Sequence, residues 1–417
     1  MNKIIQALDG VSRRHFLKNT SLAVAGAAVV PHVITAQAAD NTPIKVGLIG
    51  CGGRGKGAVE DVKQADSNVK IIAVSDVFKD RADGAGKQFG VAPDMVFSGF
   101  DAYKKVLSIP EINYVILATP PGFRPIHFPA AIDAGKHVFM EKPVAVDGPG
   151  LRAMLKAGEM ATQKKLCVVA GTQRRHQKSY VETIKRIQDG AIGDILCLRA
   201  YWNQGFIWNN PWNDQVSDME NHLRNWYHYL WLCGDHIVEQ HVHNIDVCNW
   251  VMNDFPVKAY GTGGRQILTG KGQIYDHFAV EFEYANGVRM FSQCRQIGGC
   301  SDSVSEAVVG TKGTSNPGGS ISVKGGESWR APGGKNPYVQ EHIDLIEAIR
   351  SGNYVNETKN VVGSTLTAIM GRESAYSGQI LERDAVLNSK MNTMPATLEF
   401  GSLPPVTVPM PGKYKLV

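Results

Sequence analysis

The sequence lacks the patterns that mark disulfide scaffolds, zinc cages and membrane spans. Its seven cysteines are scattered and include no C-x-x-C pair, so buried free thiols are the expected state. The apolar run from Leu22 to Val30 is about half of the ~20 residues that a spanning helix needs. Charged residues make up 20% of the chain and hydrophobic residues 43%, which excludes a disordered chain and is typical of a globular protein of two or three domains.

The first 38 residues are predicted to be an export signal that is removed. Ser12-Arg13-Arg14-His15-Phe16-Leu17-Lys18 is a twin-arginine sequence, and Ala36-Gln37-Ala38 offers a small-x-small cleavage site. The expected location is the periplasm or beyond, and no membrane span is expected in the mature chain. Residues 1–38 carry four basic and one acidic side chain, so the formal charge falls from +5 to about +2 on their removal. A nucleic-acid partner is therefore not expected.

Continuous aliphatic runs after residue 43 predict a parallel sheet. The runs are residues 44–49, 69–76, 114–119 and 137–140. Helix-length segments separate them, so we expect helices on both faces of the sheet. The predicted first domain is a doubly wound α/β Rossmann fold over residues 43–165.

A second, α+β domain with an open, mostly antiparallel sheet is predicted over residues 166–335, because strand-like segments there alternate in polarity. The expected strands are 195–202, 257–264, 277–284 and 288–296. Asn286-Gly287 predicts a two-residue hairpin turn. One or two helices are expected over 220–252. The segment 336–417 is expected to contribute helices over 339–350 and 361–378 that pack back on the first domain.

The loop Gly50-Cys51-Gly52-Gly53-Arg54-Gly55 matches the dinucleotide fingerprint G-x-G-x-x-G between a strand and a helix. Asp76 ends the second strand, where a carboxylate accepts hydrogen bonds from an adenosine ribose and repels a 2′-phosphate. NAD is therefore the predicted cofactor and NADP is less favoured, although Arg54 or Arg81 could soften that preference. A P-loop is the weaker alternative, because Gly57 stands where Ser or Thr must hold magnesium.

Glu141-Lys142-Pro143 follows the predicted strand 137–140, at the edge of the sheet where ligands of such domains bind. Lys142 is either a solvated surface cation or a group that faces the nicotinamide and hydrogen-bonds a substrate hydroxyl. Position alone leaves both open. A cis peptide bond before Pro143 would be one way to aim the lysine inward.

The segment 234–246 carries His236, Glu239 and His243. If it is helical, Glu239 and His243 are i,i+4 neighbours on one face and form a usable proton-transfer pair. Metal binding is disfavoured, because three ligands from one helix stand without any other His-rich motif, and no metal is predicted. Histidines satisfied inside a helical interface are the structural alternative.

Taken together, these motifs resemble the Gfo/Idh/MocA oxidoreductase family over essentially the whole mature chain. The resemblance is carried by the loop 50–55, Ala118-Thr119-Pro120, Glu141-Lys142-Pro143, the acid-x-x-x-His helix followed by Ile245-Asp246, and the segments 336–342 and 371–378, which resemble exported members.

The resemblance implies hydride transfer between a sugar or polyol carbon and C4 of the nicotinamide. His243 is then the general base, and Lys142 hydrogen-bonds the reacting hydroxyl. The implied cofactor contacts are Gly50, Cys51, Gly52, Gly53, Arg54, Gly55, Asp76, Thr119, Pro120, Glu141 and Lys142. The family commonly has Asp where this chain has Glu239, which is assigned to the catalytic set with its partner open.

By analogy with the family, substrate contacts are expected after the strand 167–171, at Gln173, Arg174 and Arg175, which could equally be ordinary surface residues. Aromatic residues that stack on sugar rings favour a carbohydrate over a small acid. The candidates are Tyr201, Trp202, Phe206, Trp208, Trp212, Trp226, Tyr227, Tyr229 and Trp231, most of which could be core. Tyr201, Trp202, Trp226, Tyr227 and His241 complete the predicted substrate set.

Export in a folded state favours a cofactor that stays bound, because little free NAD exists outside the cytoplasm. Three functional classes stay open. They are a sugar oxidoreductase, an NAD-dependent glycoside hydrolase or lyase that works through transient C3 oxidation and elimination, and a non-catalytic sugar-binding protein. The antiparallel sheet offers a face for self-association, so a homodimer or homotetramer is expected.

Overall fold

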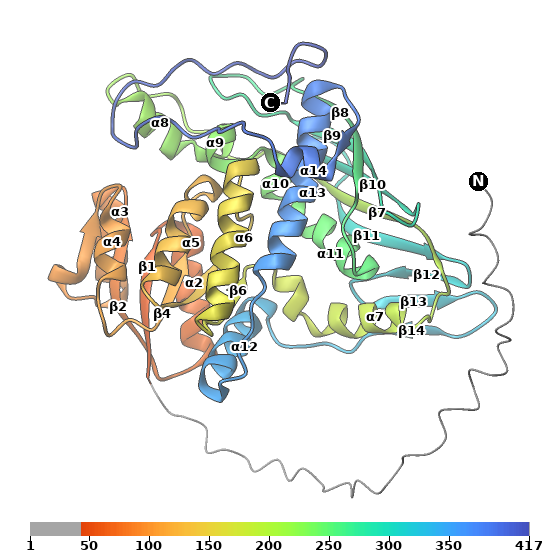
Figure 1. Ribbon diagram of the computed structural model, residues 1–417, viewed down its shortest axis with the longest axis horizontal. Coiled ribbons are helices and arrows are strands. Elements are labelled where there is room, and N and C mark those ends of the chain that lie inside the picture. Colours follow the sequence, from red (N-terminus) through yellow and green to blue (C-terminus); the bar gives the residue numbers. More distant parts are fainter. Residues whose placement is uncertain (1–42, 417) are drawn as a thin grey trace, which may run out of the picture. The chain divides into compact units, whose positions relative to one another are not determined.

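Two β-sheets organise residues 43–416, which are the residues that the computed structural model describes (Figure 1). One is a six-stranded parallel sheet and the other a nine-stranded, mostly antiparallel sheet. The predicted fold class is thereby confirmed. The predicted twin-arginine signal at residues 1–38 lies outside the described residues.

The parallel sheet has the strand order β3-β2-β1-β4-β5-β6. Its strands are β1 Ile44–Ile49, β2 Val69–Asp76, β3 Val96–Ser98, β4 Tyr114–Leu117, β5 His137–Met140 and β6 Val168–Ala170. Its helices are α2 Gly53–Ala65, α3 Lys79–Phe89, α4 Ala102–Leu107, α5 Arg124–Asp133 and α6 Gly148–Gln163. The aliphatic runs are buried on both faces: Leu48 packs with Val59 of α2, and Leu117 belongs to the cluster that holds Phe128 of α5. This burial explains why these strands lack polar alternation.

The second sheet has the order β14-β13-β12-β11-β7-β10-β9-β8-β15. Its strands are β7 Ile195–Gln204, β8 Lys258–Gly264, β9 His277–Glu283, β10 Arg289–Gln296, β11 Ser303–Gly310, β12 Gly313–Asn316, β13 Ser320–Val323, β14 Ser328–Arg330 and β15 Leu381–Glu382. Every neighbouring pair is antiparallel except β7 and β10. The β9–β10 turn differs from prediction, since Ala285, Asn286 and Gly287 all lie between Tyr284 and Val288, which are joined by a backbone hydrogen bond of 2.9 Å. Gly287 has φ +84°, as the last residue of a three-residue loop requires.

Short helices replace the one or two predicted over 220–252. They are α8 Asp218–Arg224, α9 Leu230–Cys233, α10 His236–Glu239 and α11 Val242–Met252, and α7 Lys178–Gln188 precedes them. Backbone geometry breaks the run: Gly234 and Asp235 both have φ +79°, and the Asp235 carboxylate caps α10 by accepting from the His236 amide.

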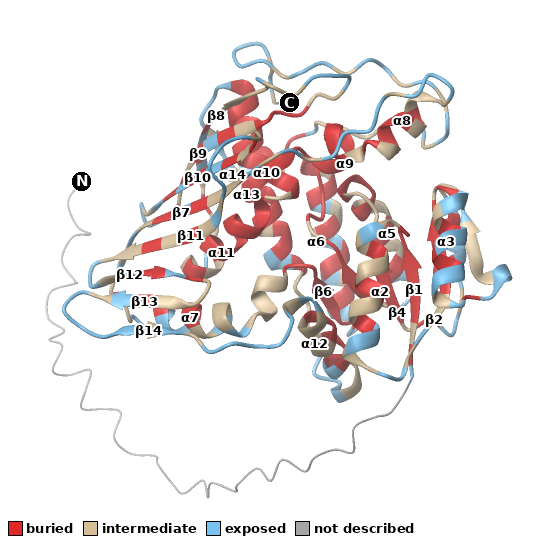
Figure 2. Ribbon diagram, turned by 180° about the vertical axis from the view of Figure 1, so that it is seen from behind, coloured by how far each residue is buried: buried red, intermediate tan, exposed pale blue. Residues whose placement is uncertain are grey.

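The C-terminal helices lie in two different places. The helix α12 Pro337–Ser351 packs against α2 of the first domain. The helix α13 Thr358–Ser377 packs against β8 of the second sheet on one side and α6 on the other, and Figure 2 shows it buried along almost its whole length. After α14 Arg383–Leu387 the chain runs without regular structure past α8, where the Met219 amide donates to the Gly401 carbonyl at 3.1 Å (Figure 1). None of the described helices combines the length and apolarity needed to cross a bilayer.

Candidate active site

A cavity of about 820 Å³ runs along the carboxyl ends of the parallel strands and continues to the second domain. The predicted residues that line it are Gly50, Cys51, Gly52, Gly53, Arg54, Asp76, Thr119, Pro120, Glu141, Lys142, Trp202, Trp226, Tyr227, Glu239 and His243. The residues predicted for dinucleotide binding and those predicted for proton transfer therefore line one continuous cavity. This is the position that ligands take in open α/β sheets.

The loop after β1 has the geometry that a pyrophosphate needs. Gly50 has φ +99°, which an L side chain rarely adopts. A Cβ on Gly55 would lie 1.9 Å from the Gly50 carbonyl oxygen, so this glycine lets α2 meet the strand and does not itself line the cavity. A Cβ on Gly52 or Gly53 would meet nothing within 4 Å. Gly52 is the N-cap residue of α2 and has no side chain to cap the helix. The first backbone N–H groups of α2 are therefore available to an anion.

Asp76 stands at the end of β2, as predicted, and is 8% exposed. Its Oδ2 accepts from the Cys51 amide at 2.8 Å and its Oδ1 from the Phe78 amide at 2.9 Å. Burial raises the pKa of this carboxyl. The Arg54 Nε atom pairs with Glu141 at 2.5 Å, on the far side of β1 from Asp76. Of Arg54 and Arg81, the two arginines that could soften the preference for NAD, only Arg81 therefore lies on the same side as Asp76.

Lys142 is not a surface cation, because its side chain is only 10% exposed. The Nζ atom donates to the backbone carbonyl of Glu239 at 2.7 Å and lies 3.4 Å from Glu239 Oε1. The Lys142–Pro143 peptide bond is cis. The lysine at the end of β5 therefore reaches across to α10 and joins the two domains inside the cavity.

His243 lies in the first turn of α11 and is 7% exposed. Its ring stacks on Trp202 with a centroid distance of 5.7 Å and an interplanar angle of 20°. No side-chain hydrogen bond joins it to any residue of 43–416. Burial, with the nearby cation of Lys142, holds the pKa of His243 well below its ordinary value. The imidazole is therefore neutral at neutral pH and able to accept a proton.

Glu239 pairs with Lys142, and within residues 43–416 no hydrogen bond joins it to His243. A break at residues 240–241 separates α10 from α11, so the predicted proton-transfer pair is not formed. Burial raises the pKa of Glu239 to about 7, against the opposing effect of Lys142. Its Oε2 atom is buried without a partner in the described chain.

Four of the predicted residues for substrate lie outside this cavity. Arg175 forms a two-point ion pair with Asp246 at 2.8 and 2.9 Å, and His241 is fully buried with Nε2 2.7 Å from Ser292 Oγ. Tyr201 neighbours Trp202 on β7, and successive strand residues face opposite sides of the sheet. Arg174 lines an adjacent cavity instead.

Arg124 is a cavity residue that the sequence analysis missed. It is fully buried at the start of α5 and donates to the carbonyls of Leu117 and Thr119, both at 2.8 Å. It thus fixes the chain that follows β4. Nothing in the local sequence marks it, since its partners are backbone atoms.

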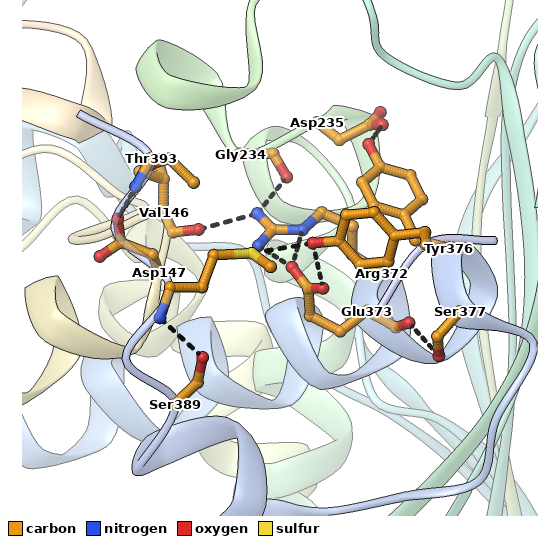
Figure 3. Close-up of polar contacts among 12 residues, drawn as sticks. Val146, Asp147, Gly234, Asp235, Arg372, Glu373, Tyr376, Ser377, Ser389 and Thr393 are labelled. Atoms are coloured by element: carbon orange, nitrogen blue, oxygen red, sulfur yellow. Dashed lines mark hydrogen bonds and ion pairs between the residues drawn. The ribbon is translucent and has the colours of Figure 1, made fainter. Parts of the chain in front are cut away.

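Arg372 of α13 bonds the backbone of the first domain near Lys142 and the backbone of the second domain just before α10 (Figure 3). Its guanidinium is 1% exposed and donates to the carbonyl of Val146 at 2.8 Å and to that of Gly234 at 3.0 Å. The first carbonyl belongs to the segment that follows Lys142, and the second to the segment just before α10. Glu373 compensates the charge.

Within residues 43–416 no cluster of three or more His, Cys, Asp or Glu side chains could hold a metal ion.

The family models match the two parts of this site separately. Residues 44–172 match the oxidoreductase family with an NAD-binding Rossmann fold, and residues 180–316 match the GFO/IDH/MocA C-terminal domain. The chain belongs to the Gfo/Idh/MocA family. The prediction of NAD is confirmed at this level, and the preference for NAD over NADP stays a prediction.

Among curated proteins, the inositol 2-dehydrogenase of Klebsiella pneumoniae strain 342 is 27% identical over 256 residues, or 60% of this chain and 68% of the relative. A levoglucosan dehydrogenase structure, in complex with NADH and levoglucosan, has a TM-score of 0.67 at 19% identity over 82% of this chain and 99% of its own. An aldose-aldose oxidoreductase structure from Caulobacter crescentus has a TM-score of 0.67 at 17% identity over the same shares of the two chains.

The glycine loop gives a first prediction. Gly55→Ala is expected to destabilise the fold by about 1–3 kcal/mol, because the new methyl overlaps the Gly50 carbonyl. Gly53→Ala is the matched control, since its Cβ meets no described atom. Thermal unfolding of the two variants without added nucleotide measures the difference. Equal melting temperatures would contradict the close approach.

Glu239 gives a second prediction, testable without any substrate. Its folded pKa of about 7 lies above the ordinary value of 4.5, so ionisation in the unfolded state costs stability as pH rises from about 4.5 to about 7. Glu239→Gln removes that cost. The difference in melting temperature, variant minus wild type, is expected to grow by about 2–4 °C as the pH rises through this interval and to stay constant above pH ~7.

The control is Glu382→Gln, the same substitution at a side chain that is 70% exposed. A Glu239→Gln difference that is constant from pH 4.5 to 8 would show that the carboxyl titrates at its ordinary value.

Proposed function

We propose that this member of the Gfo/Idh/MocA family is an NAD-dependent oxidoreductase that acts on a ring hydroxyl carbon of a sugar or sugar derivative. The observation that carries the proposal is that Lys142 of the first domain and the neutral His243 of the second line the same cavity as the glycine-rich loop 50–55, called the phosphate loop below. The relatives support the substrate class, since an inositol 2-dehydrogenase is similar in sequence and a levoglucosan dehydrogenase and an aldose-aldose oxidoreductase are similar in fold.

The residues present fit a dinucleotide. The open space beside Gly52 and Gly53 at the start of α2 would hold the pyrophosphate, and Asp76 would take the adenosine ribose. When bound, NAD supplies the hydride acceptor.

The proton goes to His243. Its unpartnered imidazole accepts the hydroxyl proton of the sugar as the carbonyl forms, which needs a neutral base. Lys142 donates a hydrogen bond to the same oxygen and stabilises its developing negative charge. Glu239 holds the ammonium in place through its carbonyl and carboxyl oxygens. Trp202, Trp226 and Tyr227 offer apolar faces to the C–H faces of the ring.

Tight retention of the cofactor is part of the proposal. The aromatic wall at the ribose end of the cavity includes Phe78 and Phe100. Phe400 of the C-terminal segment packs on both, with ring centroids 6.1 and 5.3 Å away. The Leu403 amide fastens this segment to Asp218 of α8 at 3.0 Å. The C-terminal segment therefore packs behind Phe78 and Phe100. It has to move before these two rings can move apart, and this slows the dissociation of the dinucleotide.

Export through the twin-arginine pathway and a dimeric or tetrameric state stay predictions. The glycoside-cleaving alternative uses the same cavity, because it begins with the same hydride transfer. It differs in outcome, since an aglycone is released without net NADH.

Lys142→Met is expected to lower the turnover of sugar oxidation by about 100-fold or more and to leave NADH binding intact, because the lysine contacts the reacting oxygen and not the phosphate loop. Lys63→Met, on the exposed side of α2, is the matched control. Each variant is incubated with a panel of sugars and aryl glycosides. Nicotinamide absorbance measures sugar oxidation, and aglycone release measures glycoside cleavage. Wild-type turnover in Lys142→Met would exclude the proposed role.

Phe400→Ala is expected to raise the dissociation rate of NADH about fivefold, because an aromatic packing contact is worth about 1 kcal/mol. Phe206→Ala is the control, since Phe206 is 70% exposed and does not line the cavity. Stopped-flow displacement of bound NADH measures the rates. If both variants release NADH at the wild-type rate, the tail does not retain the cofactor.

A further inference from the structure

A second cavity of about 570 Å³ opens beside the reactive one. Its walls come from the turn after β6, the start of α7, strands β11 to β14 and the start of α12. None of the residues assigned to hydride transfer lines it. Its volume lies within the range of small-molecule sites.

The two cavities share a wall made of Gln173 and Tyr338, which line both. The Gln173 amide nitrogen donates to the Tyr338 hydroxyl at 3.2 Å, while its Oε1 atom is buried with no partner in residues 43–416. Arg54 covers the Tyr338 ring, with 5.0 Å from the guanidinium carbon to the centroid, yet the tyrosine is 40% exposed. A ligand that extends from one cavity into the other would therefore pass the unpaired Gln173 Oε1 atom and the exposed ring of Tyr338.

The floor of the second cavity is a buried polar network around Glu306. The carboxylate of Glu306, 2% exposed, accepts from Arg174 at 2.6 Å, from Tyr180 at 3.1 Å and from Asn244 at 2.6 Å. Arg174 also stands 5.8 Å from the ring centroid of Trp202, which stacks on His243. The floor of one cavity therefore continues into the aromatic wall of the other.

The lining favours a ligand rich in hydroxyl groups. The charge of Arg174 is neutralised by Glu306, and the remaining walls carry amides, hydroxyls and the two tyrosine rings. Amides pair with hydroxyl groups in both directions, and rings cover the C–H faces of a pyranose. Arg330, on the edge strand β14, adds donors.

We infer that the second cavity binds a second sugar unit, so that the substrate is a glycoside of at least two units, one oxidised beside His243 and the other held between Tyr338 and Glu306. The inference rests on the proposed function for the first unit. It assigns the second cavity to binding and to the choice of substrate, and no bond changes there.

Val304→Trp tests the inference. Val304 is 38% exposed, lines only the second cavity, and lies two residues before Glu306 on β11, so its side chain faces the same side of the sheet. An indole there fills the space for a second ring. Val181→Trp on α7 is the matched control, because Val181 is 40% exposed and lines neither cavity.

The three holoproteins are compared on glucose, methyl glucosides, maltose, cellobiose and trehalose. Reduction of bound NAD gives kcat/KM, and saturation-transfer NMR reports which ring contacts the protein. At least one disaccharide is expected to exceed its monosaccharide by about tenfold in wild type, which corresponds to about 1.4 kcal/mol. Val304 pairs with Trp202 across β11 and β7, so Val304→Trp is expected to lower the monosaccharide rate as well. The expected result is that kcat/KM for the disaccharide falls about tenfold more than kcat/KM for the monosaccharide, and that Val181→Trp changes neither.

Equal effects of Val304→Trp on the two sugar sizes, or no effect, would overturn the inference and leave the proposed function standing. The absence of any saturation transfer to a second ring would also overturn it. Disaccharide binding that Val304→Trp abolishes, with no reduction of NAD by any sugar, would support the second site and reject the oxidoreductase function.

Discussion

The contact between the Lys142 ammonium and Glu239 fixes the geometry of the whole site. It joins the end of a parallel strand to a helix of the second domain, through a carbonyl at 2.7 Å and a carboxyl at 3.4 Å. Both groups are buried, and breaking such a pair by removing one partner leaves an uncompensated charge. Arg372 donates to the carbonyls of Val146, four residues after Lys142, and of Gly234, two residues before α10, so it links the same two chain segments a second time (Figure 3).

Burial also divides the chemical roles among the cavity residues. The pKa of His243 is held well below its ordinary value by burial beside Lys142, and the pKa of Glu239 is raised to about 7. An imidazole that stays neutral beside an ammonium is an acceptor next to a donor, which is what removal of a proton and hydride from one carbinol requires.

Local patterns predict the first domain well and the second less well. The ends of β1, β2 and β5 follow from aliphatic runs that only a covered parallel sheet explains, and the glycine loop needs the positive φ of Gly50. The partner of Glu239 is 97 residues away, so spacing along one helix suggested His243 instead. The sequence does not mark Arg124, whose partners are backbone atoms, and of the second cavity it predicts Arg174 but not the walls, which come from distant strands. Arg175 is a predicted substrate contact, yet it pairs with Asp246, which lies 71 residues away in the sequence.

The central claim is that the reacting hydroxyl of a sugar lies between Lys142 and His243, with the nicotinamide ring beside the carbon that bears it. A crystal structure of the protein with NADH and a bound sugar tests it most directly. The account predicts the reacting sugar carbon about 3–3.5 Å from C4 of the nicotinamide, with its hydroxyl in hydrogen-bond reach of both Lys142 Nζ and a His243 ring nitrogen. A nicotinamide ring that lies away from the reacting carbon, or a sugar hydroxyl that reaches neither side chain, would contradict it.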